Sequence, residues 1–517
     1  RQPYNGSTGD TVGSLAYDYK QYNINYGASP SGTGRALLYS YAPTLTFSLT
    51  GTVSKTYDGA DTATLTSSNY SVSGAVNSDS ITYNKPTSGT YDTKNVGTSK
   101  TVSVTSVTLT SVASSTSKPV YGYSVAATSI SGSVGTVIAA TANVSATKTY
   151  DGGTTLTSGQ VTITGVTVGA NTEVLTYTGT ASLSDANVAT SNKYVVVSSM
   201  TLANGGTGST TGLASNYNLP SGAYNATSNS ASISTASLGI SMTATYSGST
   251  TVSSPTATLT GLASADSSAT VSSVVINNKN VASATYVISL VLSNGKQSNY
   301  SLNSSVNTTL GSNTTNKVTL SAANLTVTAD SQTTTYGTVI STGTGKTSFT
   351  SSGLLGTDAI DSVTLATTQT ATTNAATSGI TITPSAATGA SFTATNYSIT
   401  YATGSVTINK APLGITVSGT YSGSTTLSSP TFTVAAGLMN SETLTSLTSA
   451  TLNSKDVANN STNYVTAIVK GAGTANIATN YQITAARNAS AGTNTTNTVT
   501  LSAANLTVTA DSQTTTY

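Results

Sequence analysis

The stretch VTLSAANLTVTADSQTTTY occupies residues 318–336 and recurs unchanged at residues 499–517. Its segment ANLTVTA alternates apolar with polar residues, which is typical of a β-strand with one buried face. Other short alternating runs, such as GSVTINK (404–410), occur elsewhere in the chain, and long runs of strong helix formers are missing. Because Thr and Val favour strands, the sequence predicts an all-β fold made of repeated units.

Composition excludes several classes of protein. The 517 residues are too many for one hydrophobic core, so several domains are expected. With 37% hydrophobic residues and a net charge of +2, the chain lacks the low hydrophobicity and high net charge usual in disordered chains. The near-zero charge argues against nucleic acid and anionic membranes as partners, since both need a basic patch. No run of about 18 apolar residues is present, so no membrane insertion is expected.

Two tyrosine markers recur with a spacing of about 90 residues, the size of a small β-sandwich domain. The first marker, which we call the opening tyrosine, follows an alternating strand in a short turn such as KTYDG. The opening tyrosines are Tyr57, Tyr150, Tyr246, Tyr336, Tyr421 and Tyr517. The second marker, the closing tyrosine, lies in stretches such as NYSL. The closing tyrosines are assigned as Tyr22, Tyr123, Tyr217, Tyr300, Tyr397 and Tyr481.

A third element, which we call the NV element, recurs between the tyrosines. It reads TKNVGTS (93–99), DANVATS (185–191), NKNVASA (278–284) and SKDVANN (454–460). The repeat between Tyr336 and Tyr397 lacks a recognisable copy and contains GLLGTDAIDSV (353–363) instead. Two types of domain are therefore predicted.

These motifs carry a family resemblance. KTYDG followed by an NV element resembles the YDG repeat of large secreted bacterial adhesins related to filamentous haemagglutinin. The stretch LTVTADSQTTTYG…GLLGTD…NYSITYATGSVTINKAPL (325–413) resembles the mostly-β glycan-binding (MBG) repeat that often alternates with it. Together they cover nearly the whole chain. The resemblance implies an extracellular or cell-surface bacterial protein built as a tandem array of immunoglobulin-like β-sandwich domains.

The markers divide the chain into seven segments. We expect them to be the C-terminal half of an incomplete MBG-like domain (1–43), three YDG-like domains (44–140, 141–235 and 236–322), a complete MBG-like domain (323–411), a fourth YDG-like domain (412–503) and the first strand of a further MBG-like domain (504–517).

The first and last segments are expected to complete one another between chains. Leu506, Val508 and Ala510 would face inward and, with Tyr517, insert beside a neighbour's N-terminal segment. The residues expected to receive them are Tyr22, Ile24 and Tyr26. Such a head-to-tail contact propagates as a filament. The alternative is a window onto a much longer repeat chain, as the start at Arg1 rather than Met also allows.

The sequence gives little support for a catalytic site or a metal site. The chain has no His and no Cys, which excludes a Ser-His-Asp triad and any thiolate or imidazole metal site. The only Glu residues, Glu173 and Glu442, fall in different domains. Asp358 and Asp361 are interpreted as polar turn residues rather than an acid/base pair. We therefore expect neither an enzyme nor a cofactor.

The KTYDG turns contain residues that two further chemistries could use. Asp58 and Asp61 could share a calcium ion, but equivalent turns carry Ser, so the interpretation is a tight turn without a metal. Lys55 and Lys148 could form crosslinks to Asn, against the simpler interpretation of exposed edge lysines.

Tyrosines gather near the N-terminus, where they indicate a core or a subunit interface, or else stacking on sugar rings. They are Tyr4, Tyr17, Tyr19, Tyr22, Tyr26, Tyr39 and Tyr41. The function predicted is a secreted structural protein, a filament or matrix fibre made of end-to-end copies. The alternatives are an adhesin that binds surface glycans and a passive stalk.

Overall fold

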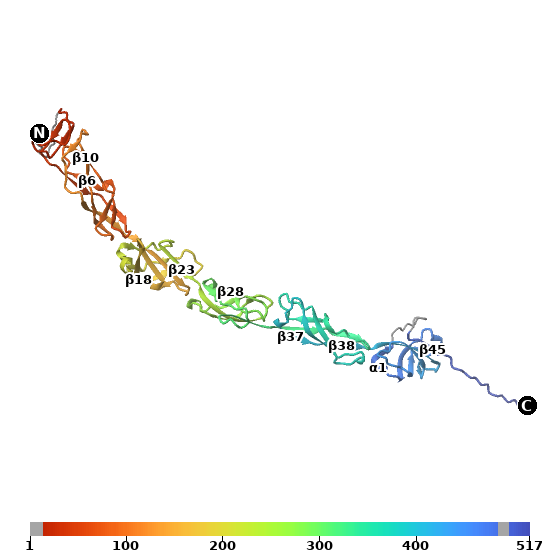
Figure 1. Ribbon diagram of the computed structural model, residues 1–517. Coiled ribbons are helices and arrows are strands. Elements are labelled where there is room, and N and C mark those ends of the chain that lie inside the picture. The colour runs from red at the N-terminus through yellow and green to blue at the C-terminus, as the bar shows by residue number, and fades with distance from the viewer. Residues whose placement is uncertain (1–13, 484–495, 517) are drawn as a thin grey trace. The chain divides into compact units, whose positions relative to one another are not determined.

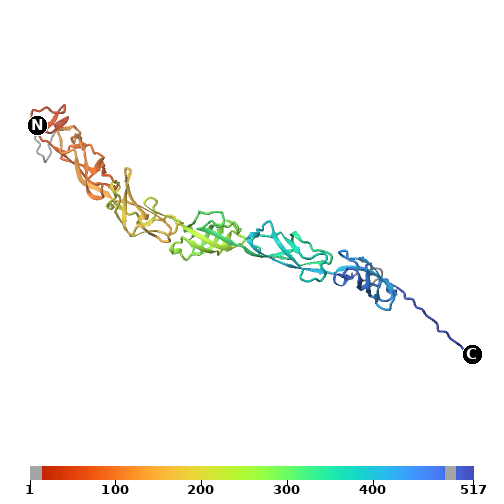
Figure 2. The ribbon, with the colours of Figure 1, turned by 60° about the horizontal axis from the view of Figure 1, so that its bottom comes forward.

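The computed structural model describes residues 14–483 and 496–516, and in this part of the chain nearly all regular structure is β-strand. The remaining elements are short 3₁₀ turns and one helical turn, α1 (Ile477–Asn480). The predicted all-β array is therefore confirmed. The strands gather into successive small β domains (Figure 1), which a second view separates equally well (Figure 2).

The chain divides into two compact parts. The first part comprises the residues up to Leu238 together with Gly261–Ala269 and Asn294–Ser301. The second part comprises Gly239–Thr260, Thr270–Ser293 and the residues from Leu302 on.

The N-terminal segment is joined to the first YDG-like domain by strand pairing. Strand β1 (Tyr19–Gln21) lies between β2 (Ala36–Leu38) and β11 (Val120–Tyr121) and pairs in parallel with both. The other strands of this domain form a five-stranded sheet ordered β4-β13-β9-β8-β5 and two smaller sheets. They are β3 (Thr44–Leu49), β4 (Val53–Thr56), β5 (Thr62–Thr64), β6 (Tyr70–Ser73), β7 (Ser80–Tyr83), β8 (Ser88–Tyr91), β9 (Gly97–Val104), β10 (Leu109–Ala113), β12 (Ser124–Val125) and β13 (Ile130–Ile138).

The second YDG-like domain has a five-stranded sheet ordered β21-β18-β17-β15-β23, a three-stranded sheet β16-β19-β20 and the pair β14-β22. Its strands are β14 (Ala140–Thr141), β15 (Asn143–Thr149), β16 (Thr155–Leu156), β17 (Val161–Val168), β18 (Asn171–Gly179), β19 (Ala181–Leu183), β20 (Val195–Val196), β21 (Met200–Asn204), β22 (Tyr217–Asn218) and β23 (Asn229–Ser234).

The third YDG-like domain contains the three-stranded sheet β25-β27-β28, and its β24 pairs with β26 and β30. Its strands are β24 (Ala236–Thr245), β25 (Thr251–Ser253), β26 (Thr256–Thr260), β27 (Val271–Ile276), β28 (Val287–Leu292), β29 (Tyr300–Leu302) and β30 (Asn316–Ser321).

The next domain, at residues 323–411, stacks a three-stranded sheet β34-β31-β37 and a five-stranded sheet β32-β38-β36-β35-β33. Its strands are β31 (Ala323–Ala329), β32 (Gln332–Thr335), β33 (Gly343–Lys346), β34 (Phe349–Ser352), β35 (Ser362–Thr367), β36 (Thr381–Thr388), β37 (Tyr397–Ala402) and β38 (Gly404–Asn409). The last YDG-like domain has β39 (Ala411–Thr420), β40 (Thr426–Ser428), β41 (Thr431–Ala436), β42 (Ser446–Leu452), β43 (Val465–Ala472), β44 (Tyr481–Ile483) and β45 (Val499–Ser502).

The repeated stretch has two different environments in its two copies. In β31 the alternation is fulfilled, because pairing with β34 and β37 leaves Leu325 1% and Val327 0% exposed. In the second copy, residues 503–516 form no strand, and Leu506 and Val508 are 86% and 82% exposed. An apolar face is thus buried only where two neighbouring strands are present.

This pair of copies gives a matched test of packing. Leu325→Ala should lower the free energy of unfolding of its domain by about 2–5 kcal/mol, because it leaves a cavity in the core. Leu506→Ala, the same change in the same local sequence, should cost the isolated chain less than about 0.5 kcal/mol. Urea denaturation followed by circular dichroism measures both, and equal effects would contradict this account of the core.

Candidate functional site: tyrosine–carboxylate clusters at the domain junctions

Opening and closing tyrosines from successive domains meet on one buried carboxylate. Tyr57 of the first YDG-like domain donates a hydrogen bond to Glu173 Oε1 (2.8 Å), and Tyr217 of the second donates to Glu173 Oε2 (2.7 Å). The two rings pack edge to face with centroids 5.4 Å apart, a favourable arrangement of their quadrupoles. Glu173 itself is only 3% exposed. The cluster therefore joins two domains through one acid.

Three more junctions repeat this arrangement. Their members are Tyr150, Asp266 and Tyr300; Tyr246, Asp358 and Tyr397; and Tyr336, Glu442 and Tyr481. In each, both hydroxyls donate to the carboxylate, and the ring centroids lie 5.3–5.5 Å apart at interplanar angles of 74–80°. Each closing hydroxyl also accepts a backbone N–H, as Tyr397 does from Leu355 (3.0 Å). A closing tyrosine thus also holds the segment of its own domain that precedes the acid.

A fifth cluster lies near the N-terminus and corrects one assignment. Tyr22 and Tyr123 both donate to Asp79 Oδ2 at 3.1 Å, and Lys20 pairs with Asp79 Oδ1 at 3.0 Å. Tyr123 occupies the closing position, so Tyr22 takes the place of an opening tyrosine. Grouping Tyr22 with the closing tyrosines was wrong, because an aromatic between polar residues does not reveal which side of a junction it serves.

The NV elements form a second link at the same junctions. The Asn before Tyr217, Tyr300 and Tyr397 ends a short helical turn and bonds to the NV element of the preceding domain. Asn216 Oδ1 accepts from Val96 N (3.0 Å), and its Nδ2 donates to Asn95 Oδ1 (3.0 Å). The same pair of bonds joins Asn299 to Asn187 and Val188, and Asn396 to Asn280 and Val281.

The domain at 323–411 also has such an element, contrary to expectation. Asn374 Oδ1 accepts from Asn480 Nδ2 (2.9 Å), and Ala375 N donates to Asn480 Oδ1 (2.9 Å). The sequence there reads NAA instead of NV. The second hydrogen bond comes from a backbone N–H, so the Val of the NV element can be replaced by Ala. The NV motif therefore does not reveal this copy in the sequence.

Glycines of the KTYDG-type turns explain why the junctions are tight. Gly59 has φ +78°, and a Cβ there would lie 2.2 Å from Val168 Cγ2 in the next domain. Gly248 has φ +77°, and its Cβ would lie 2.8 Å from the backbone N of Gly356. Only glycine meets both demands, the positive φ and the close approach.

The electrostatics favour neutral tyrosines around a charged acid. Burial, followed by the hydrogen bond to Asp358, raises the pKa of Tyr246 to about 12. Burial likewise raises the pKa of Tyr397 to about 12. Burial alone would raise the pKa of Asp358, but hydrogen bonds from both tyrosines and from Lys279 (3.3 Å) bring it below its ordinary value. Lys94 contacts Glu173 in the same way (3.3 Å).

The other candidate residues have structural roles. Asp358 is the acid of a junction, while Asp361 accepts from Ala390 N (2.8 Å) in an exposed turn. Asp58 accepts from Ala60 N (3.0 Å), which supports the turn interpretation. In the described ranges no three potential metal-binding side chains gather.

The two turn lysines are not exposed edge residues as expected. The side chains of Lys55 and Lys148 are 16% and 2% exposed. Lys148 donates to the carbonyls of Gly153 (3.0 Å) and Thr155 (2.7 Å), and Lys55 to Ala60 O (2.7 Å). Each lysine therefore folds under its own turn and caps the carbonyls there.

The N-terminal tyrosines are partly a core. Tyr19, Tyr22 and Tyr39 are at most 4% exposed, and the rings of Tyr22 and Tyr39 stack with centroids 4.9 Å apart. Tyr26 is 92% exposed and Tyr41 41% exposed. Tyr4 lies outside the described residues.

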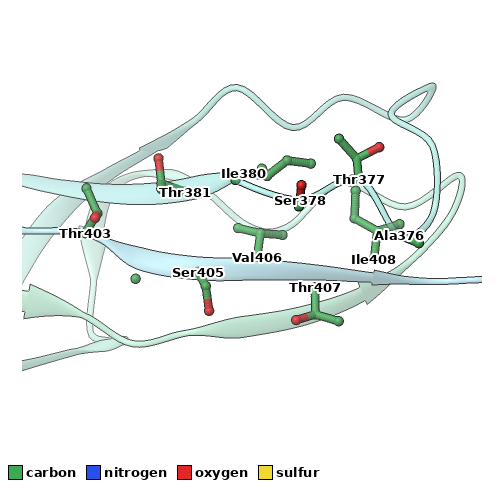
Figure 3. Close-up of a pocket in the computed structure, with 12 residues that line it drawn as sticks. Ala376, Thr377, Ser378, Ile380, Thr381, Thr403, Ser405, Val406, Thr407 and Ile408 are labelled. Atoms are coloured by element: carbon green, nitrogen blue, oxygen red, sulfur yellow. The ribbon is translucent and has the colours of Figure 1, made fainter.

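A surface pocket of about 480 Å³ lies between β38 and the segment 376–381. Figure 3 shows Val406 and Ile408 of β38 facing Ile380 and the nearby Ser and Thr side chains. Its lining contains neither an aromatic ring nor a charged side chain. It therefore lacks the stacking surface on which a sugar ring usually packs.

The fold and the repeated junctions are those of a tandem β-repeat protein. Comparison with family models identifies some of its domains. The family model of the YDG domain matches residues 41–129 and 135–228, and that of the MBG domain (YGX type) matches residues 325–407. The chain therefore contains YDG and MBG domains, as the resemblance predicted. These are binding or structural repeat domains rather than enzyme families. Searches of curated proteins and of solved structures find no match.

YDG and MBG domains suggest an adhesin-like or glycan-binding repeat protein. Over the residues that the structure describes, no helix has the length and apolar character needed to cross a membrane.

Removing one junction acid tests the clusters. Asp266→Ala leaves the hydroxyls of Tyr150 and Tyr300 without their acceptor, and should lower the free energy of unfolding by about 2–4 kcal/mol. The control Asp330→Ala removes an exposed carboxylate and should change it by less than about 0.5 kcal/mol. Urea denaturation measures both, and an Asp266→Ala protein as stable as the control would rule out a stabilising role.

The raised tyrosine pKa values predict alkaline sensitivity. An unfolded tyrosine ionises near pH 10, whereas Tyr246 and Tyr397 in the folded chain have a pKa of about 12. Their contribution to stability is complete below pH 10 and is lost as pH rises toward 12. Absorbance at 295 nm should show these tyrosines ionising later than exposed ones. Their ionisation with the exposed class, in a chain that remains folded, would contradict the clusters.

Proposed function

We propose that this chain is an extracellular structural protein that forms a filament or matrix fibre. The observation that carries the proposal is the repetition of one closed cluster at successive junctions, since it serves cohesion between domains and leaves no reactive group open. The links between domains are also minimal. One residue separates β13 from β14, β30 from β31, and β38 from β39. Links this short restrict bending far more than flexible linkers do.

Head-to-tail joining through the C-terminal strand is the proposed mode of assembly. Leu506 and Val508 are exposed, and Ala510 is exposed beside them, so their apolar face is available to a neighbour. Strand β2 lies at the edge of its sheet, and an edge can accept another strand.

The residues expected to receive the donated strand, Tyr22, Ile24 and Tyr26, differ in exposure. Tyr22 and Ile24 are 0% and 3% exposed within their own chain, whereas Tyr26 is exposed. Tyr22 already donates to Asp79 in the position of an opening tyrosine. In the proposed assembly, Leu506 and Val508 of the donated strand make the apolar contacts. Tyr517 lies outside the described residues.

A glycan-binding adhesin is the second candidate, favoured by the MBG domain match. A passive stalk, as a segment of a longer covalent chain, is the third. Binding to a glycan array at micromolar protein concentration would favour the adhesin. Native material with a denatured mass several times the 51.4 kDa of this chain would favour the stalk.

Strand donation has a matched test. Leu506→Asp places a charge on the apolar face and should abolish end-to-end association, because burying an unpaired carboxylate costs several kcal/mol. Thr507→Asp, on the opposite face, should leave association intact. Sedimentation velocity and negative-stain microscopy measure both. A wild-type chain that stays monomeric at high concentration, or a Leu506→Asp chain that still forms fibres, would contradict donation.

A further inference from the structure

The last YDG-like domain carries an opening tyrosine in a different state from the others. Tyr421 is 36% exposed, whereas Tyr57, Tyr246 and Tyr336 are each 2% exposed. The turn glycine beside it differs in the same way. A Cβ at Gly423 would meet nothing within 4 Å, although the corresponding position in each closed junction collides with the next domain.

The other residues that a preceding domain contributes to a junction lie near Tyr421. Lys455 Nζ lies 5.9 Å from the centroid of the Tyr421 ring, and Lys455 holds the NV-element position at which Lys94 and Lys279 contact junction acids. Asp456 takes the place of Asn95 and Asn280. Those residues accept a hydrogen bond through Oδ1, which a carboxylate oxygen can do equally well.

We propose that Tyr421, Gly423, Lys455 and Asp456 form a half-junction, a binding surface for one further β domain of this repeat type. The occupant supplies a carboxylate to the Tyr421 hydroxyl and Lys455, and an Asn-Tyr corner to Asp456 and the Tyr421 ring. Lys455 pairs with Asp456 Oδ1 at 2.9 Å, so the incoming acid would share this lysine with Asp456. The residues of this surface are distinct from Leu506 and Val508 of the strand proposed for donation.

The sequence after the half-junction selects the type of occupant. The half-junction at Tyr246 and Lys279 is followed by VTLSAANLTVTADSQTTTY (318–336), which leads into the MBG domain that provides Asp358 and Tyr397. The same residues follow Tyr421 and Lys455 at 499–517. The recurring stretch therefore identifies an MBG-type domain as the occupant that fits this half-junction.

An extended chain tests the proposal. A copy of residues 337–411 is appended after Tyr517, which reproduces the interior sequence from 318 to 411. Tyrosine modification by tetranitromethane, located by peptide mass spectrometry, then compares Tyr421 with Tyr246 in both chains. Tyr421 should be modified in the 517-residue chain and lose that modification in the extended chain, while Tyr246 stays protected in both. Changing the appended copy of Asp358 to Lys should restore modification at Tyr421.

Each other outcome overturns the proposal. Equal modification of Tyr421 in both chains would show that no domain binds there. An appended copy that protease digests would show that the half-junction cannot support the domain, since the same sequence folds in the interior. Concentration-dependent protection of Tyr421 in the unextended chain would assign the surface to a second copy instead.

Discussion

The buried carboxylate that accepts two tyrosine hydroxyls is the interaction on which the domain array depends. An ionised acid in a protein interior is costly unless it is fully hydrogen-bonded. Here two neutral phenols, from domains that follow one another, satisfy the acid. Separating the domains would remove the opening tyrosine from the acid, so opening a junction loses this hydrogen bond together with the ring contact. The Asn bridges then fix the orientation that the tyrosines alone would leave free.

Much of the fold followed from sequence, because alternation and period are local properties. Leu325 and Val327 are buried as the pattern in ANLTVTA predicts. The tyrosine and NV markers were equally visible as repeats. Their meaning was hidden, because each marker makes its contact with another domain. In four junctions the acid lies 106–116 residues after its opening tyrosine.

The acids themselves gave no sequence signal. Glu173 and Glu442 seemed isolated and Asp358 resembled a turn residue, because the position accepts either side chain and its neighbours vary. A search 106–116 residues after each opening tyrosine would have found the four acids, although Asp361 falls in the same window as Asp358. Tyr22 was misassigned for the opposite reason: its immediate neighbours fit the closing motif, and only its contact with Asp79 reveals its place.

The tolerance for Asp or Glu has a consequence for how such chains change over generations. A YDG domain is followed by another YDG domain at Glu173, and the domain expected to be YDG-like at 236–322 is followed by the MBG domain at Asp358. In both junctions two tyrosines donate to the acid. Both kinds of junction thus use the same tyrosine–carboxylate contact. Duplication or loss of a whole domain in the gene leaves every remaining joint intact. Chains of this kind can lengthen, shorten or reorder without new joints having to evolve.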